Sequence, residues 1–537
     1  MFLRAFLASI LAMGAVASLG CPGGDGSIGD SCGGNGDCDS SLQCVAKACV
    51  PRCQRAPECG DGYACTGDGL CVAARGQNGD VCHSEVECSA GLSCQIDGNT
   101  IDTESLLTAS CTKENAGKPA AGECASDADC RNGTCALGRC VDLCSDTRDC
   151  SAGNACMEVP RVETPANGAL FDGCLPSRGN VVWQIAIAGP QTTVLLPVPS
   201  AARSATVVFR VDDAAQRVGA SKIFAPHDSA ADPSYLLPCQ PTGPNDPLCN
   251  SALAQDRYFQ QRIRHLPDFG QSVLQIPGTT AGALQTGAYK VTVESFRSSG
   301  ATGSAIPHVT AVMKMDTAAN LDLHFHFLDL DDHPCAAVFG NEHLGAERAQ
   351  AASYFQTQYL AELRSIIASA NLSIGDITYD DVPDHHDLDT LAVEDAPALF
   401  SLGTHARGVE IYFVRALSPV GIQAYGPNPG PGGVAGTRQS GIAIGIDTLC
   451  YQKPGQEWQK LARLTAHEIA RYMGLYHNVE LEADDGEHDA WRDGIDDTDA
   501  DPDNRHPELN LMFFSDRGGE ELSAGQREIL SRSPVLR

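Results

Sequence analysis

Three hydrophobic patterns follow one another along the 537-residue chain. Residues 32–174 hold few apolar side chains besides cysteine, so they offer little material for an ordinary core. From about residue 178, short β-rich runs bounded by Gly and Pro predict a β-sandwich. From residue 316 onward, alternating strand patterns mix with helical spacing, which predicts an α/β region. A chain of this length exceeds one hydrophobic core, so several domains are expected.

The middle region, placed at 177–315, contains runs in which apolar residues alternate with small or polar ones. Trp183 lies in the first of them, and helical spacing is scarce throughout. Nothing in this region has catalytic spacing, so a spacer role and a substrate-binding role both stay open. The predicted strands are 181–188, 192–198, 205–211, 272–276 and 288–296.

The last region, 316–537, opens with a period-two stretch at 321–330 that predicts a strand. His324 and His326 share one face of that strand. They could bind a metal, but a strand pair far in sequence from other ligands is more often structural. An amphipathic helix is predicted at 343–370. Further strands are predicted at 373–379, 409–417 and 440–446.

The cysteines form an internal repeat within 21–176. Of the 25 cysteines, twenty fall into five groups of four, and within each group the first two are six residues apart. Units this small need cross-links to fold, so the spacing predicts five disulfide-bonded modules with three possible pairings each. The groups are Cys32, Cys38, Cys44, Cys49; Cys53, Cys59, Cys65, Cys71; Cys82, Cys88, Cys94, Cys111; Cys124, Cys130, Cys135, Cys140; and Cys144, Cys150, Cys156, Cys174.

Two alternatives to a plain disulfide stalk are possible for this cysteine repeat. A zinc ribbon needs close C-x-x-C pairs, and the repeat contains none. An adhesive or partner-binding array is the second alternative and stays open. Setting Cys21 aside leaves 24 cysteines, the even number that a disulfide framework in an oxidising compartment requires. We therefore also predict the pairs Cys239–Cys249 and Cys335–Cys450.

Charge and the first residues indicate an exported protein. With 68 acidic and 37 basic residues the net charge is −31, which argues against a nucleic-acid partner. Residues 1–20 carry one charge and then an apolar run, as a signal peptide does. Residues 18–21 resemble the lipobox of bacterial lipoproteins, in which the cysteine, here Cys21, carries a lipid. Ser18 departs from that motif, and ordinary signal cleavage after 15–17 is the alternative.

No later stretch is apolar and long enough to span a membrane, so membrane attachment is expected through the N-terminal lipid alone. The protein is accordingly expected in the bacterial cell envelope, at the surface as a lipoprotein, or as a secreted protein.

The strongest candidate site lies at 464–477. His467 and Glu468 open the stretch, Gly474 ends its helical part, and His477 follows. In an H-E-x-x-H helix the two histidines bind one zinc from one face, and the glutamate deprotonates the zinc-bound water. Glycine then lets the backbone turn sharply, so that a third histidine returns to the metal. Arg471 stands where the second histidine is expected.

This order resembles the metzincin motif H-E-x-x-H-x-x-G-x-x-H at every fixed position but one. Met512 looks like the residue of the metzincin methionine turn, and 494–498 and 522–526 are similar to segments of pappalysin-like bacterial metzincins. The resemblance covers 316–537 and implies a metzincin-like zincin domain that cleaves protein or peptide substrates with zinc. It assigns Glu468 as general base, His467 and His477 as zinc ligands, Gly474 as turn glycine and Met512 as support.

Arg471 is the departure from that family. A guanidinium has no lone pair for a metal and stays charged at ordinary pH. At ~4 Å and an effective dielectric near ~20, its repulsion with zinc would be on the order of 8 kcal/mol. Arg471 therefore turns away, or zinc is absent and Arg471 pairs with Glu468 three residues earlier. His467 and His477 could still hold zinc if His488 or His506 supplied a further ligand.

Three functional hypotheses follow. The first is a zinc metalloendopeptidase impaired by the substitution at 471. The second is a pseudoprotease that binds peptides or partners at the same site. The third is a purely structural surface protein in which the repeats matter most.

An acidic run at 496–503 offers oxygens at alternating positions. Their order approximates a calcium loop, although Pro502 stands where such a loop needs glycine. A solvated acidic loop is the alternative. The predicted calcium ligands are Asp497, Asp499, Asp501 and Asp503.

Overall fold

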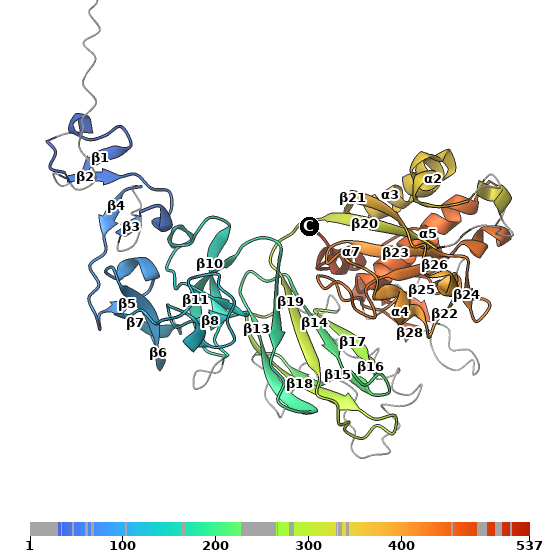
Figure 1. The fold of residues 1–537 in the computed structure, drawn as a ribbon, viewed down its shortest axis with the longest axis horizontal. Coiled ribbons are helices and arrows are strands. Elements are labelled where there is room, and N and C mark those ends of the chain that lie inside the picture. The colour runs from blue at the N-terminus through green and yellow to red at the C-terminus, as the bar shows by residue number, and fades with distance from the viewer. Residues whose placement is uncertain are drawn as a thin grey trace, which may run out of the picture.

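The computed structural model shows three regions in a row (Figure 1). A disulfide-rich array, drawn in blue to teal, leads into a β-sandwich drawn in green to yellow-green, which packs against an α/β region drawn in yellow to red. No helix among the described residues has the length and apolar character to cross a membrane. The structure describes residues 30–33, 35–45, 48–59, 63–65, 69–102, 105–162, 168–226, 265, 267–278, 284–328, 330, 336–339, 343–452, 455–480, 491–493, 495–499, 507–515 and 518–537.

Every module of the array closes with two disulfides in the same order. The first cysteine bonds the third and the second bonds the fourth, which selects one of the three pairings that spacing left open. A sulfur in a disulfide is not a thiolate and binds no zinc, so these bonds also argue against the zinc-ribbon alternative. The bonds are Cys32–Cys44, Cys38–Cys49, Cys53–Cys65, Cys59–Cys71, Cys82–Cys94, Cys88–Cys111, Cys124–Cys135, Cys130–Cys140, Cys144–Cys156 and Cys150–Cys174.

The other cysteines are less fully described. Cys450 is disulfide-bonded, but Cys335 lies outside the described residues. Cys21, Cys239 and Cys249 also lie outside them. The pairs Cys335–Cys450 and Cys239–Cys249 and the lipid on Cys21 therefore stay predictions.

One acidic residue recurs directly before the second cysteine of each module. Its carboxylate accepts the backbone N–H of the residue four positions earlier, at 2.7 to 3.0 Å. These bonds hold the 3-10 turns η1 (Asn35–Asp37), η2 (Ala56–Cys59), η3 (Glu85–Glu87), η4 (Asp127–Asp129) and η5 (Thr147–Asp149). The acceptors are Asp37, Glu58, Glu87, Asp129 and Asp149.

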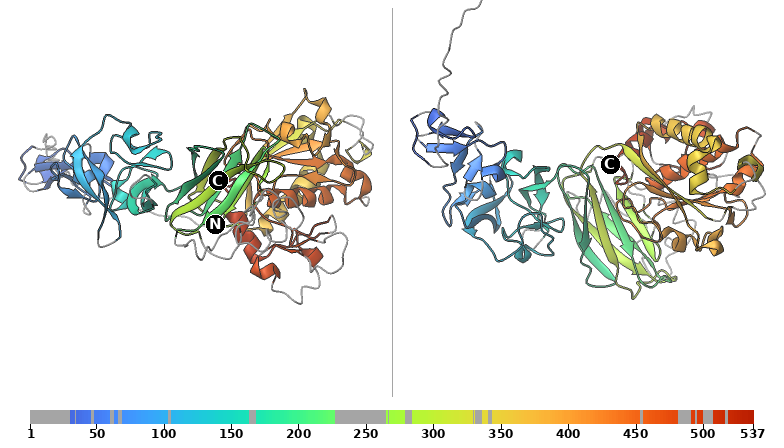
Figure 2. Two further views of the ribbon diagram at one scale, coloured as in Figure 1. Left: turned by 90° about the horizontal axis from the view of Figure 1, so that it is seen from below. Right: turned by 45° about the horizontal axis from the view of Figure 1, so that its top comes forward.

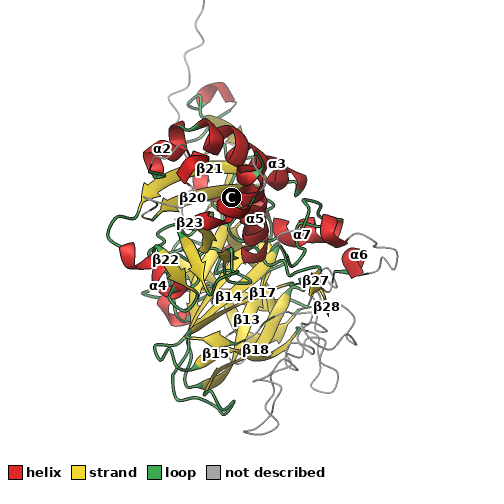
Figure 3. Cartoon of the chain, turned by 90° about the vertical axis from the view of Figure 1, so that its right-hand side faces the viewer, coloured by secondary structure: helices red, strands yellow, loops and turns green. Residues whose placement is uncertain are grey.

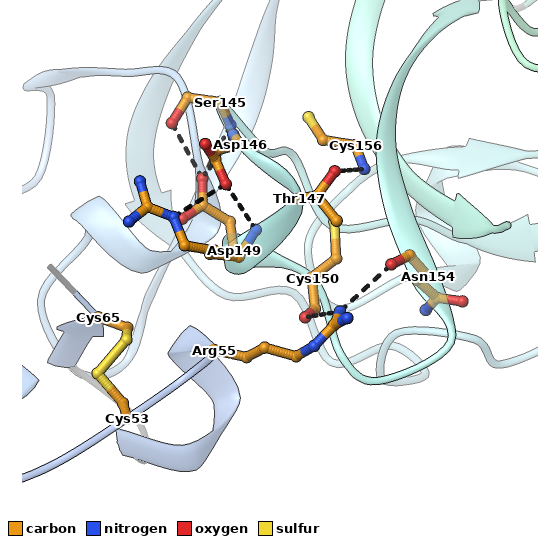
Figure 4. Close-up of polar contacts among 11 residues, drawn as sticks. Cys53, Arg55, Cys65, Ser145, Asp146, Thr147, Asp149, Cys150, Asn154 and Cys156 are labelled. Atoms are coloured by element: carbon orange, nitrogen blue, oxygen red, sulfur yellow. Dashed lines mark hydrogen bonds and ion pairs between the residues drawn. A yellow bond between two sulfur atoms is a disulfide. The ribbon is translucent and has the colours of Figure 1, made fainter. Parts of the chain in front are cut away.

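Short strands complete the modules, and the array folds back on itself. Arg55 of the second module donates through Nη1 to the carbonyl oxygens of Cys150, Ser151 and Asn154 in the fifth, at 3.3 to 3.4 Å (Figure 4). The strands are β1 (Leu42–Val45), β2 (Ala48–Pro51), β3 (Tyr63–Cys65), β4 (Cys71–Ala73), β5 (Val81–Cys82), β6 (Leu92–Ile101), β7 (Leu107–Lys113), β8 (Cys135–Ala136), β9 (Arg139–Cys140), β10 (Asn154–Pro160) and β11 (Leu170–Pro176).

The middle region is a sandwich of two four-stranded antiparallel sheets, as predicted. Their strand orders are β12-β19-β14-β17 and β13-β18-β15-β16. The five predicted runs correspond to β12 to β14, β17 and β18, whereas β15, β16 and β19 were not predicted. The bounds are β12 (Asn180–Ile185), β13 (Gln191–Val198), β14 (Ser204–Arg210), β15 (Arg217–Phe224), β16 (Asp268–Phe269), β17 (Gln271–Ile276), β18 (Gly287–Phe296) and β19 (His308–Lys314).

The sandwich core continues into the array. Leu107 of the third module and Val159 and Phe171 of the fifth belong to the same buried cluster as Val181 and Leu196 of the sandwich. One core therefore crosses residue 176, the proposed boundary between stalk and sandwich.

The α/β region is built on a five-stranded sheet of order β21-β20-β23-β26-β25. The strands pair in parallel except β25, which runs antiparallel at one edge. A small second sheet pairs β22 with β24, and β27 pairs with β28. The bounds are β20 (Asn320–Phe327), β21 (Ser373–Asp381), β22 (Thr390–Ala392), β23 (Val409–Val414), β24 (Ala416–Ser418), β25 (Ala424–Tyr425), β26 (Ile442–Gly445), β27 (Val479–Glu480) and β28 (Trp491–Arg492).

The helix predicted at 343–370 is interrupted, which corrects the sequence expectation. Ala352 is extended, with φ −75° and ψ 130°, and a π turn follows at Tyr354–Tyr359. That turn buries Phe355 and Tyr359 against Phe325 of β20. The helices are α2 (Ala346–Ala351), α3 (Leu360–Ser369), α4 (Ala396–Phe400), α5 (Glu457–Tyr472), α6 (Asp496–Asp499) and α7 (Ala524–Ser531), with 3-10 turns at Ala336–Phe339, His386–Leu388, Ile446–Tyr451 and Pro507–Leu509.

The main core of this region lies between one face of the sheet and helices α3 and α5 (Figure 3). Side chains alternate along a strand, so Leu323 and Phe325 face these helices while His324 faces the other side. In the same way Ile411 and Phe413 of β23 belong to the helix-side core. The two faces of one sheet thus carry different chemistry.

Residues 532–537 lie between the sandwich and the α/β region, beside the C label of Figures 1 and 2. Nδ2 of Asn180 donates to the carbonyl oxygen of Pro534 at 2.6 Å, and the hydroxyl of Ser204 donates to that of Arg532. The fully buried Lys314 donates to the carbonyl oxygen of Leu536 at 3.5 Å. These contacts attach the sandwich to the C-terminal segment of the α/β region.

Candidate active site

The motif lies on α5, which forms because one face of 457–472 is apolar. Trp458, Leu461 and Ile469 are buried in the main core, and the helix ends at Tyr472. Gly474 follows with φ +109°, a conformation that L side chains rarely adopt. A Cβ there would also lie 2.7 Å from Oε1 of Gln275 of the sandwich. The glycine of the motif is therefore required both by its backbone conformation and by the packing of the sandwich.

His467 and His477 converge after this turn. Their Nε2 atoms lie 3.2 Å apart. Nδ1 of His467 lies 2.7 Å from the carbonyl oxygen of Leu511, and since a carbonyl only accepts, Nδ1 carries the proton and Nε2 presents its lone pair. Two nitrogens bound to one tetrahedral zinc at ~2.05 Å would be about 3.3 Å apart. This pair of histidines fits a zinc ion.

The surroundings keep His467 neutral, the form that a metal ligand needs. Burial lowers the pKa of His467 well below its ordinary value, and the nearby His477 and Arg471 lower it further. The hydrogen bond to the carbonyl of Leu511 acts in the opposite direction but is weaker than these causes.

Arg471 pairs with Glu468. Its Nη1 lies 3.4 and 3.5 Å from the two carboxylate oxygens, on one face of the helix. The Glu468 side chain is 5% exposed and that of Arg471 26%. The carboxylate that would act on water is therefore held by a permanent cation.

The methionine turn supports both ligand segments. Met512 is fully buried, and its carbonyl oxygen accepts the N–H of Asn478, next to His477, at 3.1 Å. The neighbouring carbonyl of Leu511 holds His467. The backbone carbonyl oxygens of residues 511 and 512 thus hold the two histidine segments in place, while the Met512 side chain packs in the core.

Two polar residues of the resembling segments, to which the sequence assigned no individual role, shape this turn. Oδ1 of Asn510 accepts the N–H of Met512 at 2.8 Å, and Nδ2 of Asn510 donates to Oε1 of Gln526 at 2.9 Å. Gln526 also completes a capping box with Ser523 at the start of α7. The order Ser-x-x-Gln at 523–526 is a sequence signal for such a helix start.

Other predicted site residues are only partly placed. Asp497 accepts the N–H of Gly525 at 2.8 Å from the short helix α6. Asp501 and Asp503 lie outside the described residues, as do His488 and His506, and the side chain of Asp499 is not described. The calcium loop and the histidine rescue of zinc therefore stay predictions.

No protein-family model matches this sequence. Among curated proteins, the chain is similar to a Turripeptide OL55-like protein of Lophiotoma acuta, with 27% identity over 106 residues, 20% of this chain and 98% of that protein. Among solved structures it is similar to archaemetzincin from Methanopyrus kandleri, with 12% identity, a TM-score of 0.24, and coverage of 40% of this chain and 94% of that one.

It is also similar to mature mirolysin of Tannerella forsythia in complex with a cleaved peptide, with 15% identity, a TM-score of 0.24, and coverage of 40% of this chain and 91% of that one. The chain combines a disulfide-rich N-terminal region, a β-sandwich and a mixed α/β region that carries the motif helix.

Proposed function

We propose that the α/β region is a metzincin-type peptide-binding domain in which Arg471 has disabled hydrolysis. One observation carries this proposal: the guanidinium of Arg471 lies 3.4 Å from the carboxylate of Glu468. Hydrolysis of the metzincin kind needs three metal ligands and a carboxylate free to take a proton from water. The substitution removes one ligand and occupies the carboxylate.

The edge of the sheet supports peptide binding. Strand β25 ends the order of the described sheet, so its outer side has no partner strand among the described residues. A Cβ at Gly426, the next residue, would lie 3.4 Å from Oε2 of Glu468. A peptide that adds to β25 as a further strand would therefore pass beside the Arg471–Glu468 pair.

A second candidate is an impaired zinc endopeptidase. It is favoured by the 3.2 Å separation of the His467 and His477 nitrogens, which suits two ligands of one zinc. Zinc would supply an activated water at this site. With Arg471 on Glu468, no described group of the motif is free to accept the proton of that water.

The test compares wild type with Arg471→His and Arg471→Gln. Arg471→Gln removes the charge without adding a ligand, so it is the matched control. We expect zinc at the motif histidines and cleavage of a quenched fluorescent peptide library only for Arg471→His, while all three chains bind uncleaved peptides. Peptide cleavage by wild type, lost in Glu468→Gln while zinc stays at His467 and His477, would favour the enzyme instead.

We also propose that the protein is exported and anchored by a lipid on Cys21. The ten disulfides of the array suit an oxidising compartment. The expected result is partition of the wild-type protein into a detergent phase and of Cys21→Ala into the aqueous phase. Equal partition of both chains would contradict the anchor.

A further inference from the structure

A second imidazole cluster lies on the face of the sheet opposite α5. His326 of β20, Glu410 of β23 and His405 of the 401–408 loop come together there. Nε2 of His326 lies 2.6 Å from Oε2 of Glu410, and Nδ1 of His405 lies 3.0 Å from Oε1. Three side chains of metal-binding type thus meet from three segments of the chain.

Neighbouring rings fix the direction of both imidazoles. His405 stacks on His324 with ring centroids 3.6 Å apart and an interplanar angle of 2°. His326 stacks on Tyr412 at 4.7 Å. Ring planes held in this way keep the nitrogen atoms aimed at Glu410, which is the orientation that a bound ion requires of its ligands.

His324 supports the cluster without being a ligand. Its Nδ1 lies 3.0 Å from the hydroxyl of Thr378 and its Nε2 lies 3.0 Å from the carbonyl oxygen of Arg407. Both ring nitrogens are therefore used. The structure thus assigns His324 the structural role expected from sequence, whereas His326 on the same face has a different environment.

The charge of Glu410 is balanced by imidazoles alone in the described part of the chain. Its side chain is 2% exposed, and its ion-pair partners are His326 and His405. Two imidazoles and the backbone N–H of His405 therefore surround a buried carboxylate. Carboxylate and imidazole are the side-chain ligands that divalent transition ions commonly use.

We propose that His326, His405 and Glu410 form a second metal site, which binds zinc or a similar divalent transition ion. The contacts of 2.6 and 3.0 Å are close to the ~3.3 Å that separates two ligands of one tetrahedral zinc, so small side-chain shifts open room for the ion. His405 is 36% exposed at its side chain, which leaves access for the ion and for a water as fourth ligand. The ion would tie β20 and β23 to the 401–408 loop.

This site is independent of the proposed function, because its ligands lie across the sheet from α5. The experiment therefore uses the full chain carrying His467→Ala and His477→Ala, in which the motif histidines are absent. Cobalt(II) alone is the probe, since its absorption reports tetrahedral coordination, and zinc competition follows. We expect about one cobalt per chain, displaced by zinc.

Adding His405→Gln to that parent chain should weaken cobalt binding at least tenfold, and His326→Gln should do the same. His308→Gln is the matched control, because His308 is an exposed sandwich histidine, 54% exposed, that pairs with Asp212. It should leave the affinity unchanged. Circular dichroism of each chain shows whether it is folded.

The proposal is overturned if the parent chain binds no cobalt, or if both glutamine variants at 326 and 405 bind it as tightly as the parent. A parent chain that binds no cobalt but gains stability on acidification would identify the cluster as a proton-dependent ion pair. Loss of motif function alone has no bearing on these outcomes, since the motif histidines are already removed.

Discussion

The two imidazole clusters of the α/β region lie on opposite faces of one sheet and balance their carboxylates differently. Glu468 of the motif faces Arg471, whose charge does not depend on pH or metal. Glu410 on the far face has the imidazoles of His326 and His405 as its ion-pair partners, and imidazole nitrogens are common metal ligands. A permanent protein cation thus faces the carboxylate of the motif, whereas side chains of metal-binding type face the carboxylate of the far cluster.

The largest expected effect is a difference in stability between variants of the two carboxylates, Glu410 and Glu468. Glu410→Gln leaves two imidazoles and the backbone N–H of His405 without their charged acceptor, and we expect a loss of about 3 kcal/mol in the free energy of unfolding. Glu468→Gln replaces a buried carboxylate whose contact with Arg471 is longer, at 3.4 Å, and should cost less, about 1 kcal/mol. Urea unfolding of both variants measures the difference. Equal losses would remove the distinction between the clusters.

The next effect concerns the motif turn. Gly474→Ala forces a side chain into a left-handed conformation and against Gln275, and we expect a loss of about 2 kcal/mol. Gly455→Ala is the matched control, since Gly455 has φ +83° with open space around its Cβ position. In the Arg471→His background, Gly474→Ala should also abolish zinc binding at the motif while the far cluster still binds cobalt. A variant that keeps motif zinc would show that the turn does not position His477.

The acidic residues that precede the second cysteines give a smaller effect. Asp129 accepts two backbone N–H groups, those of Ala125 and Ser126, and these bonds lower the pKa of its carboxyl. A group with a lowered folded pKa adds stability above its unfolded pKa and loses it as the pH falls through the folded value. In Asp129→Asn, the free energy of unfolding of the array should therefore fall less as the pH is lowered than it does in wild type. Thermal unfolding at several pH values measures this difference. An equal loss of stability at low pH in wild type and variant would argue against this role.

The smallest effect is expected at the methionine turn. The carbonyl oxygens at 511 and 512 hold the histidine segments, and the Met512 side chain contributes core packing. Met512→Leu conserves volume and should cost less than about 1.5 kcal/mol. In the Arg471→His background it should leave the zinc affinity within a few fold, as metal titration would measure. A large loss of affinity would give the thioether a role beyond packing.

Local signals made the motif and the modules predictable. His467 and His477 are ten residues apart on one helix and turn, so their meeting follows from helix geometry and one glycine. The repeated spacing predicted the disulfide modules, although spacing alone did not select the pairing. The acidic residue before each second cysteine was visible in the sequence, but its bond to the N–H four residues earlier is apparent only from the structure.

The rest depended on contacts between distant residues. His326 and Glu410 are 84 positions apart and meet only because β20 and β23 pair in the sheet. His405 reaches them from a loop whose course no periodicity predicts. The interruption of the helix at 343–370 likewise reflects packing of Phe355 and Tyr359 on the sheet, which overrides helical spacing.

The most direct test of the central claim is an anomalous-diffraction map at the zinc edge for crystals of the wild-type protein grown with zinc. The account predicts the guanidinium of Arg471 against the carboxylate of Glu468 and a zinc peak between His326, His405 and Glu410. A zinc ion held by His467, His477 and a third protein ligand, with Arg471 turned away from Glu468, would contradict it.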